Sequence, residues 1–166
     1  LIHLNINKII STNQVIFLDV GQGDASFISL ENKNILIDTG GLFSSNPSEE
    51  IITMLKSFGI NKLDFLIISH GDYDHMGDGI NLVNNYKVKN VVFNCGEFNE
   101  LEKELIKVLD KKKINYYSCI KELNIDSNKL YFLQTKKYNN ENDNSNVIYT
   151  ELDGYKFMFM GDASQE

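Results

Sequence analysis

The sequence predicts an α/β (α+β) domain in which two mixed sheets pack together and carry helices on their outer faces, an αββα sandwich. Three observations support this prediction. The chain opens with short apolar runs joined by tight turns, continues with alternating strand and helix patterns, and closes with a hairpin pattern around Asp153-Gly154. Strands that flank a strand–helix alternation favour layered sheets covered by helices. The length of 166 residues predicts a single domain over 1–166.

Hydrophobic periodicity and turn residues define the predicted elements in chain order. Apolar runs bounded by Gly, Asn and Asp predict strands over 14–20, 25–30, 35–37, 65–69, 90–93, 130–133, 147–152 and 155–160. Apolar residues at helical spacing predict helices over 46–59, 77–86 and 99–113. Asn46 and Asn99 are expected to cap the first and third helices. The run 111–113, three lysines, is interpreted as a solvated helix end.

The most informative segment is His70–His75, with the sequence His-Gly-Asp-Tyr-Asp-His, which directly follows the apolar run 65–69. It holds two of the three histidines of the chain; the third, His3, is expected on the surface. Imidazole suits zinc, iron and manganese-type ions, and carboxylates suit harder cations. Because a buried strand ends directly before these side chains, we expect metal ligands here in preference to a solvated polar loop.

Three other blocks complete a pattern with this segment: DVGQGDA at 19–25, LIDTGG at 36–41 and Gly161-Asp162. In order and spacing, the four blocks resemble the metallo-β-lactamase superfamily, and most closely its ComEC branch of DNA-uptake proteins. The resemblance covers nearly the whole chain. It implies a metallo-β-lactamase-like αββα sandwich.

The family motif H-x-H-x-D-H assigns metal-binding roles to matching positions. The resemblance implies that His70 and Asp72 belong to a first metal, and that Asp74 and His75 belong to a second. Asp162 follows an apolar strand and a glycine, and it matches the carboxylate that bridges both metals. The implied metal ligands are therefore His70, Asp72, Asp74, His75 and Asp162.

Departures from the family pattern alter the expected ligand chemistry. Asp72 stands where the family has a histidine, and no histidine follows His75. Carboxylate in place of imidazole makes the site oxygen-rich, which shifts the preference from zinc toward manganese or magnesium. We therefore expect one or two divalent ions, Mn or Zn, with the second site under-ligated. The chain also ends at Glu166, before the family's last strand and final histidine, so the sandwich is expected to be incomplete after Asp162.

Other residues are candidates for an additional ligand or a substrate contact. Asn142, Asp143 and Ser145 form a block that resembles an Asn-Asp-x-Ser block of the ComEC branch. Asp24 follows a glycine-rich turn that the family places near the metals, and an ordinary turn aspartate is the alternative. Asp38 ends a predicted strand and is expected to have a structural hydrogen-bonding role.

The resemblance implies a metal-dependent hydrolase, a phosphodiesterase or nuclease that acts through a metal-activated water. Its implied substrate is a phosphodiester, with DNA as the candidate polymer. Asp74 is the expected catalytic residue, which orients or deprotonates the attacking water. The missing histidines motivate the alternative, a non-catalytic metal- or nucleotide-binding module on a degraded metallo-β-lactamase fold.

Net charge, the length of the apolar runs and the cysteines limit which partners and which cellular location we expect for the chain. A net charge of -7 argues against a broad nucleic-acid-binding surface, but bound divalent ions would supply positive charge at one place. No apolar run approaches the roughly 20 residues that cross a bilayer. A cytoplasmic location is favoured, and the ComEC resemblance implies a membrane-attached parent and its extracellular face as the alternative. An uncovered sheet edge favours pairing with a second copy. Cys95 and Cys119 are interpreted as semi-buried thiols in preference to a disulfide.

Overall fold

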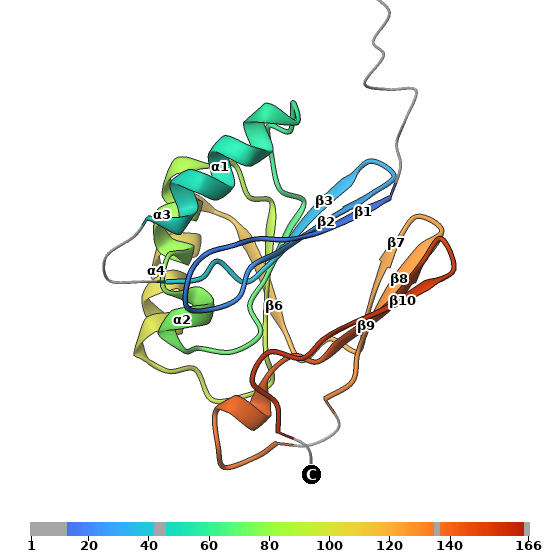
Figure 1. Ribbon diagram of the computed structural model, residues 1–166. Helices are drawn as coiled ribbons and strands as arrows, with labels where there is room; N and C mark the ends of the chain where they lie inside the picture. The colour runs from blue at the N-terminus through green and yellow to red at the C-terminus, as the bar shows by residue number, and fades with distance from the viewer. Residues whose placement is uncertain (1–12, 42–45, 135–136, 165–166) are drawn as a thin grey trace, which may run out of the picture.

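Two sheets pack face to face in the computed structural model, which describes residues 13–41, 46–134 and 137–164. Figure 1 shows three layers: the α-helices, a six-stranded sheet in the middle, and a four-stranded sheet on the far side. His3 lies outside the described residues. No helix in the described ranges is long and apolar enough to cross a membrane.

The six-stranded sheet follows chain order, β1-β2-β3-β4-β5-β6. Its strands are β1 Gln14–Phe17, β2 Ser26–Leu30, β3 Lys33–Ile37, β4 Phe65–Ile67, β5 Asn90–Phe93 and β6 Asn115–Ser118. β1 to β3 pair antiparallel, with a longer loop over 18–25 between β1 and β2 and a two-residue turn between β2 and β3, and β3 to β6 pair parallel. Parallel neighbours need crossover connections, which the helices supply. This sheet is therefore mixed, as predicted.

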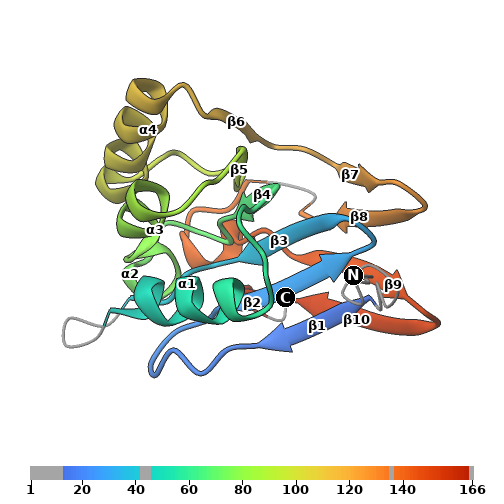
Figure 2. The same ribbon diagram turned by 90° about the horizontal axis from the view of Figure 1, so that it is seen from above.

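The four α-helices of the described residues cover one face of this sheet (Figures 1 and 2). They are α1 Pro47–Ser57, α2 Tyr73–Met76, α3 Gly79–Asn85 and α4 Glu100–Lys112. The predicted cap of α4 is confirmed, because Asn99 and Glu102 form a reciprocal capping box. The predicted cap of α1 is wrong: the Asn46 side chain makes no capping bond. Instead, Oδ2 of Asp78 accepts a hydrogen bond from the backbone N–H of Ser48 at 2.5 Å.

The four-stranded sheet has the order β10-β9-β8-β7 and is antiparallel throughout. Its strands are β7 Glu122–Ile125, β8 Asn128–Phe132, β9 Ile148–Leu152 and β10 Tyr155–Phe159. The expectation of a second mixed sheet was wrong, because two-residue turns join β7 to β8 and β9 to β10 and enforce antiparallel pairing. The predicted Asp153-Gly154 turn is confirmed. Within the described ranges, only the short 3-10 helix η2 Asn142–Asn144 belongs to this half, so no outer helical layer is described there.

Alternation along the central strands produces two hydrophobic cores. In β2, Phe27 faces the helices and Ile28 faces the second sheet. In β5, Val91 and Val92 divide in the same way. Strands that are buried on both faces read as continuous apolar runs, which is why β2 to β5 were predictable. The strand β6 was not predicted, because every residue from Asn115 to Ser118 is exposed at the sheet edge.

Cys95 and Cys119 form a disulfide, which corrects the expectation of two thiols. The two cysteines follow neighbouring parallel strands whose register places Phe93 opposite Ser118. This pairing brings the two cysteine Cα atoms to 4.6 Å, a separation that a disulfide spans. This contact was not predicted, because β6 itself was not predicted.

Candidate metal centre

Three parallel strands of the central sheet end at the same edge, and each is followed by a buried polar side chain. Asp38 follows β3, His70 lies three residues after β4, and Asn94 follows β5. All three are at most 2% exposed. In open α/β sheets, the carboxyl ends of the strands form the edge at which ligands bind. The candidate centre is built on this edge.

The two motif histidines are buried and lie against each other. Their ring centroids are 4.2 Å apart; His70 precedes the single turn of α2, and His75 lies within it. The hydroxyl of Ser69 lies 3.1 Å from Nδ1 of His70 and 3.2 Å from Nδ1 of His75. This hydroxyl therefore fixes both rings from one side and leaves both Nε2 atoms for other partners.

Asp38 fixes the orientation of His75. Its Oδ1 accepts a hydrogen bond from the backbone N–H of Ser69 at 2.7 Å, and its Oδ2 lies 3.1 Å from Nδ1 of His75. The structural hydrogen-bonding role predicted for Asp38 is confirmed. A carboxylate on Nδ1 favours the tautomer whose Nε2 carries the free lone pair, which is the usual support for a metal-binding histidine.

His75 bridges two carboxylates, because its Nε2 lies 3.1 Å from Oδ1 of Asp162. Burial lowers the pKa of His75, but the hydrogen bond to Asp38 and the charges of Asp38, Asp162 and Asp74 outweigh burial and raise the pKa to about 9. The neighbouring carboxylates therefore favour the protonated form of His75. A cation that binds at Nε2 of His75 competes with a proton for this nitrogen.

Nε2 of His70 is the unsatisfied atom of the site. His70 is completely buried, and this nitrogen has no hydrogen-bond partner among the described residues. Oδ2 of Asp72 lies 3.4 Å away, an ion-pair distance without hydrogen-bond geometry. A buried imidazole nitrogen without a partner is costly, and a metal ion is one of the partners that would satisfy it.

His70, His75 and Asp162 each offer a ligand atom, and these atoms lie within 4.8 Å of one another. Two nitrogens and one carboxylate oxygen suit zinc, manganese and iron-type ions. With the unpartnered Nε2 of His70 in this group, the donor set fits a divalent cation. Three of the five predicted metal ligands are therefore brought together.

The two remaining predicted ligands, Asp72 and Asp74, are not in this three-donor group within the described ranges. Asp72 precedes α2, and its side chain is 42% exposed beside His70. Asp74 lies in the first turn of α2 and is partly buried. Their roles as ligands, and the catalytic role of Asp74, remain predictions.

The glycine-rich turn before β2 packs against α2. The backbone N–H of Asp24 donates to the carbonyl of Asp74 at 3.2 Å. Gly23 has φ +119°, and a Cβ at this position would overlap that same carbonyl oxygen. Burial and the charges of Asp38, Asp162 and Asp74 raise the pKa of Asp24, against an opposing effect of His75. The charges of the cluster therefore act on the carboxyl group of Asp24. Its role as a substrate contact stays a prediction.

The segment that holds Asn142, Asp143 and Ser145 lies on the other side of the cluster. Nδ2 of Asn142 donates to Oδ2 of Asp162 at 3.4 Å, and Oγ of Ser145 accepts from the N–H of Asp162 at 3.3 Å. Asp143 is engaged elsewhere, because its Oδ1 accepts hydrogen bonds from Ser164, whose hydroxyl and N–H hold the pKa of Asp143 below its usual range. Asn142 and Ser145 thus position Asp162.

Sequence reasoning missed several residues that build the site. Ser69 holds both rings, and Asn146 reaches from the second sheet to the end of β4, where it donates to the carbonyls of Ser69 (2.7 Å) and Ile68 (2.9 Å). Asn99 donates to the carbonyl of Gly71 and to a carboxylate oxygen of Glu141. The capping pattern revealed Asn99 as a helix cap, but no sequence signal revealed its contact with the motif.

The two-sheet fold and the His/Asp cluster define a scaffold with a candidate metal site at one sheet edge, and comparison with known proteins identifies its family. The sequence profile described as the metallo-beta-lactamase superfamily matches residues 18–166, so the chain belongs to this superfamily. Two curated relatives are ComE operon protein 3 of Bacillus subtilis, 29% identical over 176 residues, and Recombination protein 2 of Haemophilus influenzae, 43% identical over 77 residues. The alignments cover 94% and 45% of this chain, but only 23% and 10% of the relatives. The chain therefore spans less than a quarter of the length of these relatives.

Solved structures confirm the metallo-β-lactamase fold. The subclass B3 metallo-β-lactamase MEM-A1, from a soil metagenome library, superposes with a TM-score of 0.59 at 14% identity. The match covers 90% of this chain and 60% of that chain. The metallo-β-lactamase fold protein YhfI of Bacillus subtilis gives a TM-score of 0.54 at 14% identity, over 84% of this chain and 55% of that chain. At these identities the likeness establishes the fold alone.

Proposed function

We propose that this domain is a metal-dependent hydrolase of phosphodiester bonds, with DNA as the candidate polymer. The observation that carries the proposal is the three-donor cluster of His70, His75 and Asp162 with the buried, unpartnered Nε2 of His70. The superfamily membership supports metal-dependent hydrolysis. The names of the relatives, a ComE operon protein and a recombination protein, support DNA as the substrate.

Charge explains why a phosphodiester would need the metal. Asp24, Asp38, Asp74 and Asp162 all influence the protonation of the cluster, and the chain carries a net charge of -7. Without bound cations, this edge of the sheet repels a phosphate. Divalent ions held by His70, His75 and Asp162 would reverse the local charge, and they would supply an activated water and Lewis-acid stabilisation of the phosphate.

The protein's own groups have distinct roles in the proposed reaction. Asp38 holds the ring of His75 with Nε2 directed toward Asp162. Asn142 and Ser145 hold Asp162 from the opposite side. Asp74, at the start of α2, accepts the proton of the attacking water or orients that water.

The test combines metal content and turnover. The protein is incubated with manganese or zinc, desalted and analysed for metal, and then assayed on bis(p-nitrophenyl) phosphate with and without chelator. We expect one or two retained equivalents, chelator-sensitive hydrolysis, and loss of metal in His70→Ala. Asn124→Ala, an exposed change on β7, is the matched control.

A second outcome would support the alternative function. The described residues bring only three donors together, which favours a non-catalytic metal- or nucleotide-binding module. Metal retention without any hydrolysis of phosphodiesters would favour this module and contradict the hydrolase. Failure to retain either metal would contradict both metal-dependent functions.

The disulfide bears on the location of the domain. Disulfides persist in oxidising compartments and are rare in the cytosol. The Cys95–Cys119 bond therefore favours the extracellular face of a membrane over the cytoplasmic location predicted from the sequence. Thiol titration of the unfolded protein, isolated without reductant, should detect no free cysteine. Two titratable thiols would support the cytoplasmic location.

A further inference from the structure

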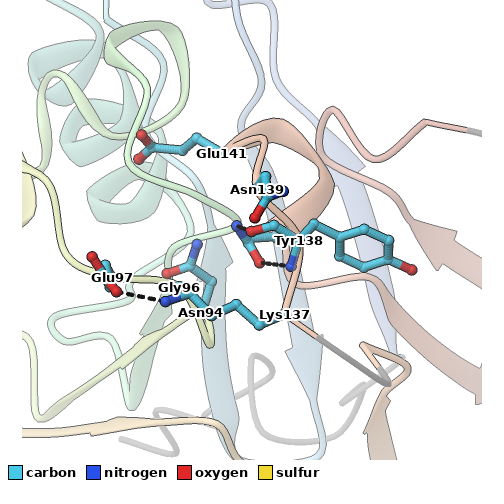
Figure 3. Close-up of a pocket in the computed structure, with 8 residues that line it drawn as sticks. Asn94, Gly96, Glu97, Lys137, Tyr138, Asn139 and Glu141 are labelled. Carbon is cyan, nitrogen blue, oxygen red and sulfur yellow. Dashed lines mark hydrogen bonds and ion pairs between the residues drawn. The ribbon is translucent and has the colours of Figure 1, made fainter.

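A polar cavity of about 330 Å³ is linked to the His70–His75 loop through Asn99, which donates both to Glu141 of the cavity lining and to the carbonyl of Gly71. Its lining includes Asn94, Gly96, Lys137, Asn139, Glu141 and Asn144, as Figure 3 shows for all but the last. This volume falls in the range of pockets that hold small organic ligands. We propose that the cavity binds the nucleobase of a substrate nucleotide whose phosphate is at the metal centre. The inference rests on the proposed phosphodiester function.

The cavity and the metal centre share one sheet edge and one loop. His70 comes after β4, and Asn94 comes directly after the neighbouring strand β5. The loop that carries Glu141 and Asn144 into the cavity wall also carries Asn142, which contacts Asp162. One nucleotide can therefore reach both places, with its phosphate and its base bound by adjacent parts of the same edge.

Asn94 is a buried polar side chain in the lining of the cavity. This side chain is 2% exposed, and its Oδ1 has no hydrogen-bond partner among the described residues. A buried carbonyl oxygen without a partner is costly, and it is satisfied by a ligand that brings an N–H donor. Nucleobases carry such donors on their exocyclic amines and ring nitrogens, and asparagine is a frequent partner of base edges.

The wall of the cavity is built before any ligand arrives. The amide of Asn144 donates to the carbonyl of Tyr138 at 2.9 Å and accepts from the N–H of Tyr138 at 2.9 Å. Lys137 and Glu97 form an ion pair of 2.6 Å at the rim (Figure 3). A ligand therefore meets a preformed pocket, which reduces the ordering cost of binding.

The charges that line the cavity favour an uncharged base over a phosphate group. Glu97 and Glu141 line the cavity, and the single lysine of the described lining is already paired with Glu97. A phosphate in this cavity would face two carboxylates, whereas an uncharged base would not. The cavity is thus suited to the base, and the metal centre is suited to the phosphate.

The first experiment measures binding without metal or turnover. In the presence of chelator, the uncharged nucleosides 2′-deoxycytidine and 2′-deoxyadenosine are added to isotope-labelled protein and followed by NMR, so that no phosphate meets the metal-free centre. We expect the backbone amide signals of Asn94, Gly96 and Asn139 to shift, while 2-deoxyribose leaves them unchanged. Equal shifts with the sugar, or no shifts with the nucleosides, would overturn the proposal.

Two variants test the pocket, and one controls for general effects. Asn94→Leu removes the unpartnered Oδ1 acceptor and should weaken nucleoside binding about tenfold. Gly96→Leu should fill the cavity with the same result, and it is expected to fold, because a Cβ there lies no nearer than 3.4 Å to its neighbours. Asn124→Leu on the exposed face of β7 should leave binding unchanged. Unchanged binding in both pocket variants would overturn the proposal.

Kinetics separate this inference from the proposed function. Asn94→Leu should raise KM about tenfold for the p-nitrophenyl ester of a nucleoside monophosphate, but leave KM for bis(p-nitrophenyl) phosphate unchanged. Equal effects on both substrates would overturn the base subsite while leaving the hydrolase intact. No hydrolysis of either substrate, together with the expected NMR shifts, would overturn the proposed function and support the subsite.

Discussion

The two flanks of the His70–His75 loop differ in how completely their polar groups are partnered. On the β3 flank, Asp38 binds both Ser69 and His75. On the β5 flank, which includes Asn94 after β5 and Glu102 of α4, Oδ1 of Asn94 and Oε1 of Glu102 are buried and lack a hydrogen-bond partner among the described residues; in the loop itself, Nε2 of His70 also lacks one. Satisfied networks hold geometry, whereas buried unsatisfied groups mark places where a ligand or ion would be stabilised. The β3 flank therefore holds the reacting groups in place, and the β5 flank is suited to receive ligands.

The largest expected effect is the loss of turnover in Asp74→Ala. The backbone of Asp74 is held by the glycine-rich turn of the β3 flank, and its carboxylate is the proposed proton acceptor. We expect kcat on bis(p-nitrophenyl) phosphate to fall about 1,000-fold while the protein remains folded by circular dichroism. Asp110→Ala, at an exposed position of α4, should leave kcat unchanged. Full activity in Asp74→Ala would remove the catalytic role of the β3 flank.

Gly23→Ala tests how closely the β3 flank is packed. The new Cβ would overlap the carbonyl of Asp74 at a backbone φ of +119°, so we expect a loss of about 3 kcal/mol in the free energy of unfolding. Gly154→Ala is the matched control: φ is +81°, but no atom lies within 4 Å of the added Cβ, so the loss should be about 1 kcal/mol. Urea denaturation measures both values. Equal losses would show that the approach of the turn to α2 is unimportant.

Asp38→Asn should disturb the hydrogen bonding of the β3 flank, because it replaces the carboxylate that accepts from Nδ1 of His75. Asparagine can still accept from the N–H of Ser69, but its amide then faces Nδ1 of His75 and forces the proton onto Nε2. We expect the pKa of His75 to fall from about 9, by NMR titration, and metal affinity to fall 10- to 100-fold. Asp64→Asn is the control, because Asp64 is equally buried but pairs with Lys89. Similar losses of metal affinity in both variants would indicate general destabilisation.

The sequence predicted the β3 flank better than the β5 flank, for a physical reason. Alternation in β2 to β5 and the glycine-rich blocks are local patterns, so the strand order and the position of the motif could be predicted. His70, His75 and Asp162 follow from motif matching, and the structure brings them together. Ser69 and Asn146 act only through tertiary contacts between the sheets, which no local pattern records.

Tertiary contacts also explain the errors. Asn46 and Asn99 present the same capping pattern, yet a distant carboxylate from Asp78 caps the first helix while Asn99 caps its own. The disulfide of Cys95 and Cys119 depends on β6, an exposed edge strand whose sequence, Asn-Tyr-Tyr-Ser, shows no alternation of apolar and polar residues. The unpartnered state of Asn94 is likewise a property of the assembled edge.

The smallest expected effect is a pH dependence that comes from Glu102 on the β5 flank. Burial raises the pKa of Glu102 to about 7 from 4.5, although the N–H of Asn99 donates to its carboxylate. The unfolded chain releases this proton near pH 4.5 and the folded chain near pH 7, so between these values the folded state holds more protons. The contribution of Glu102 to the free energy of unfolding therefore falls as the pH rises through this window, by about 1–2 kcal/mol after allowance for solvent screening.

Glu102→Gln should remove this dependence, because glutamine is uncharged and its carbonyl can still accept from Asn99. We expect the variant to gain stability relative to the parent chain between pH 5 and about pH 8, measured by urea denaturation in steps of pH. Glu104→Gln, an exposed change on the same helix, should show no such gain. A constant difference between Glu102→Gln and the parent chain across this range would mean that Glu102 has access to a partner or to water. The contrast between the two flanks would then depend on Asn94 alone.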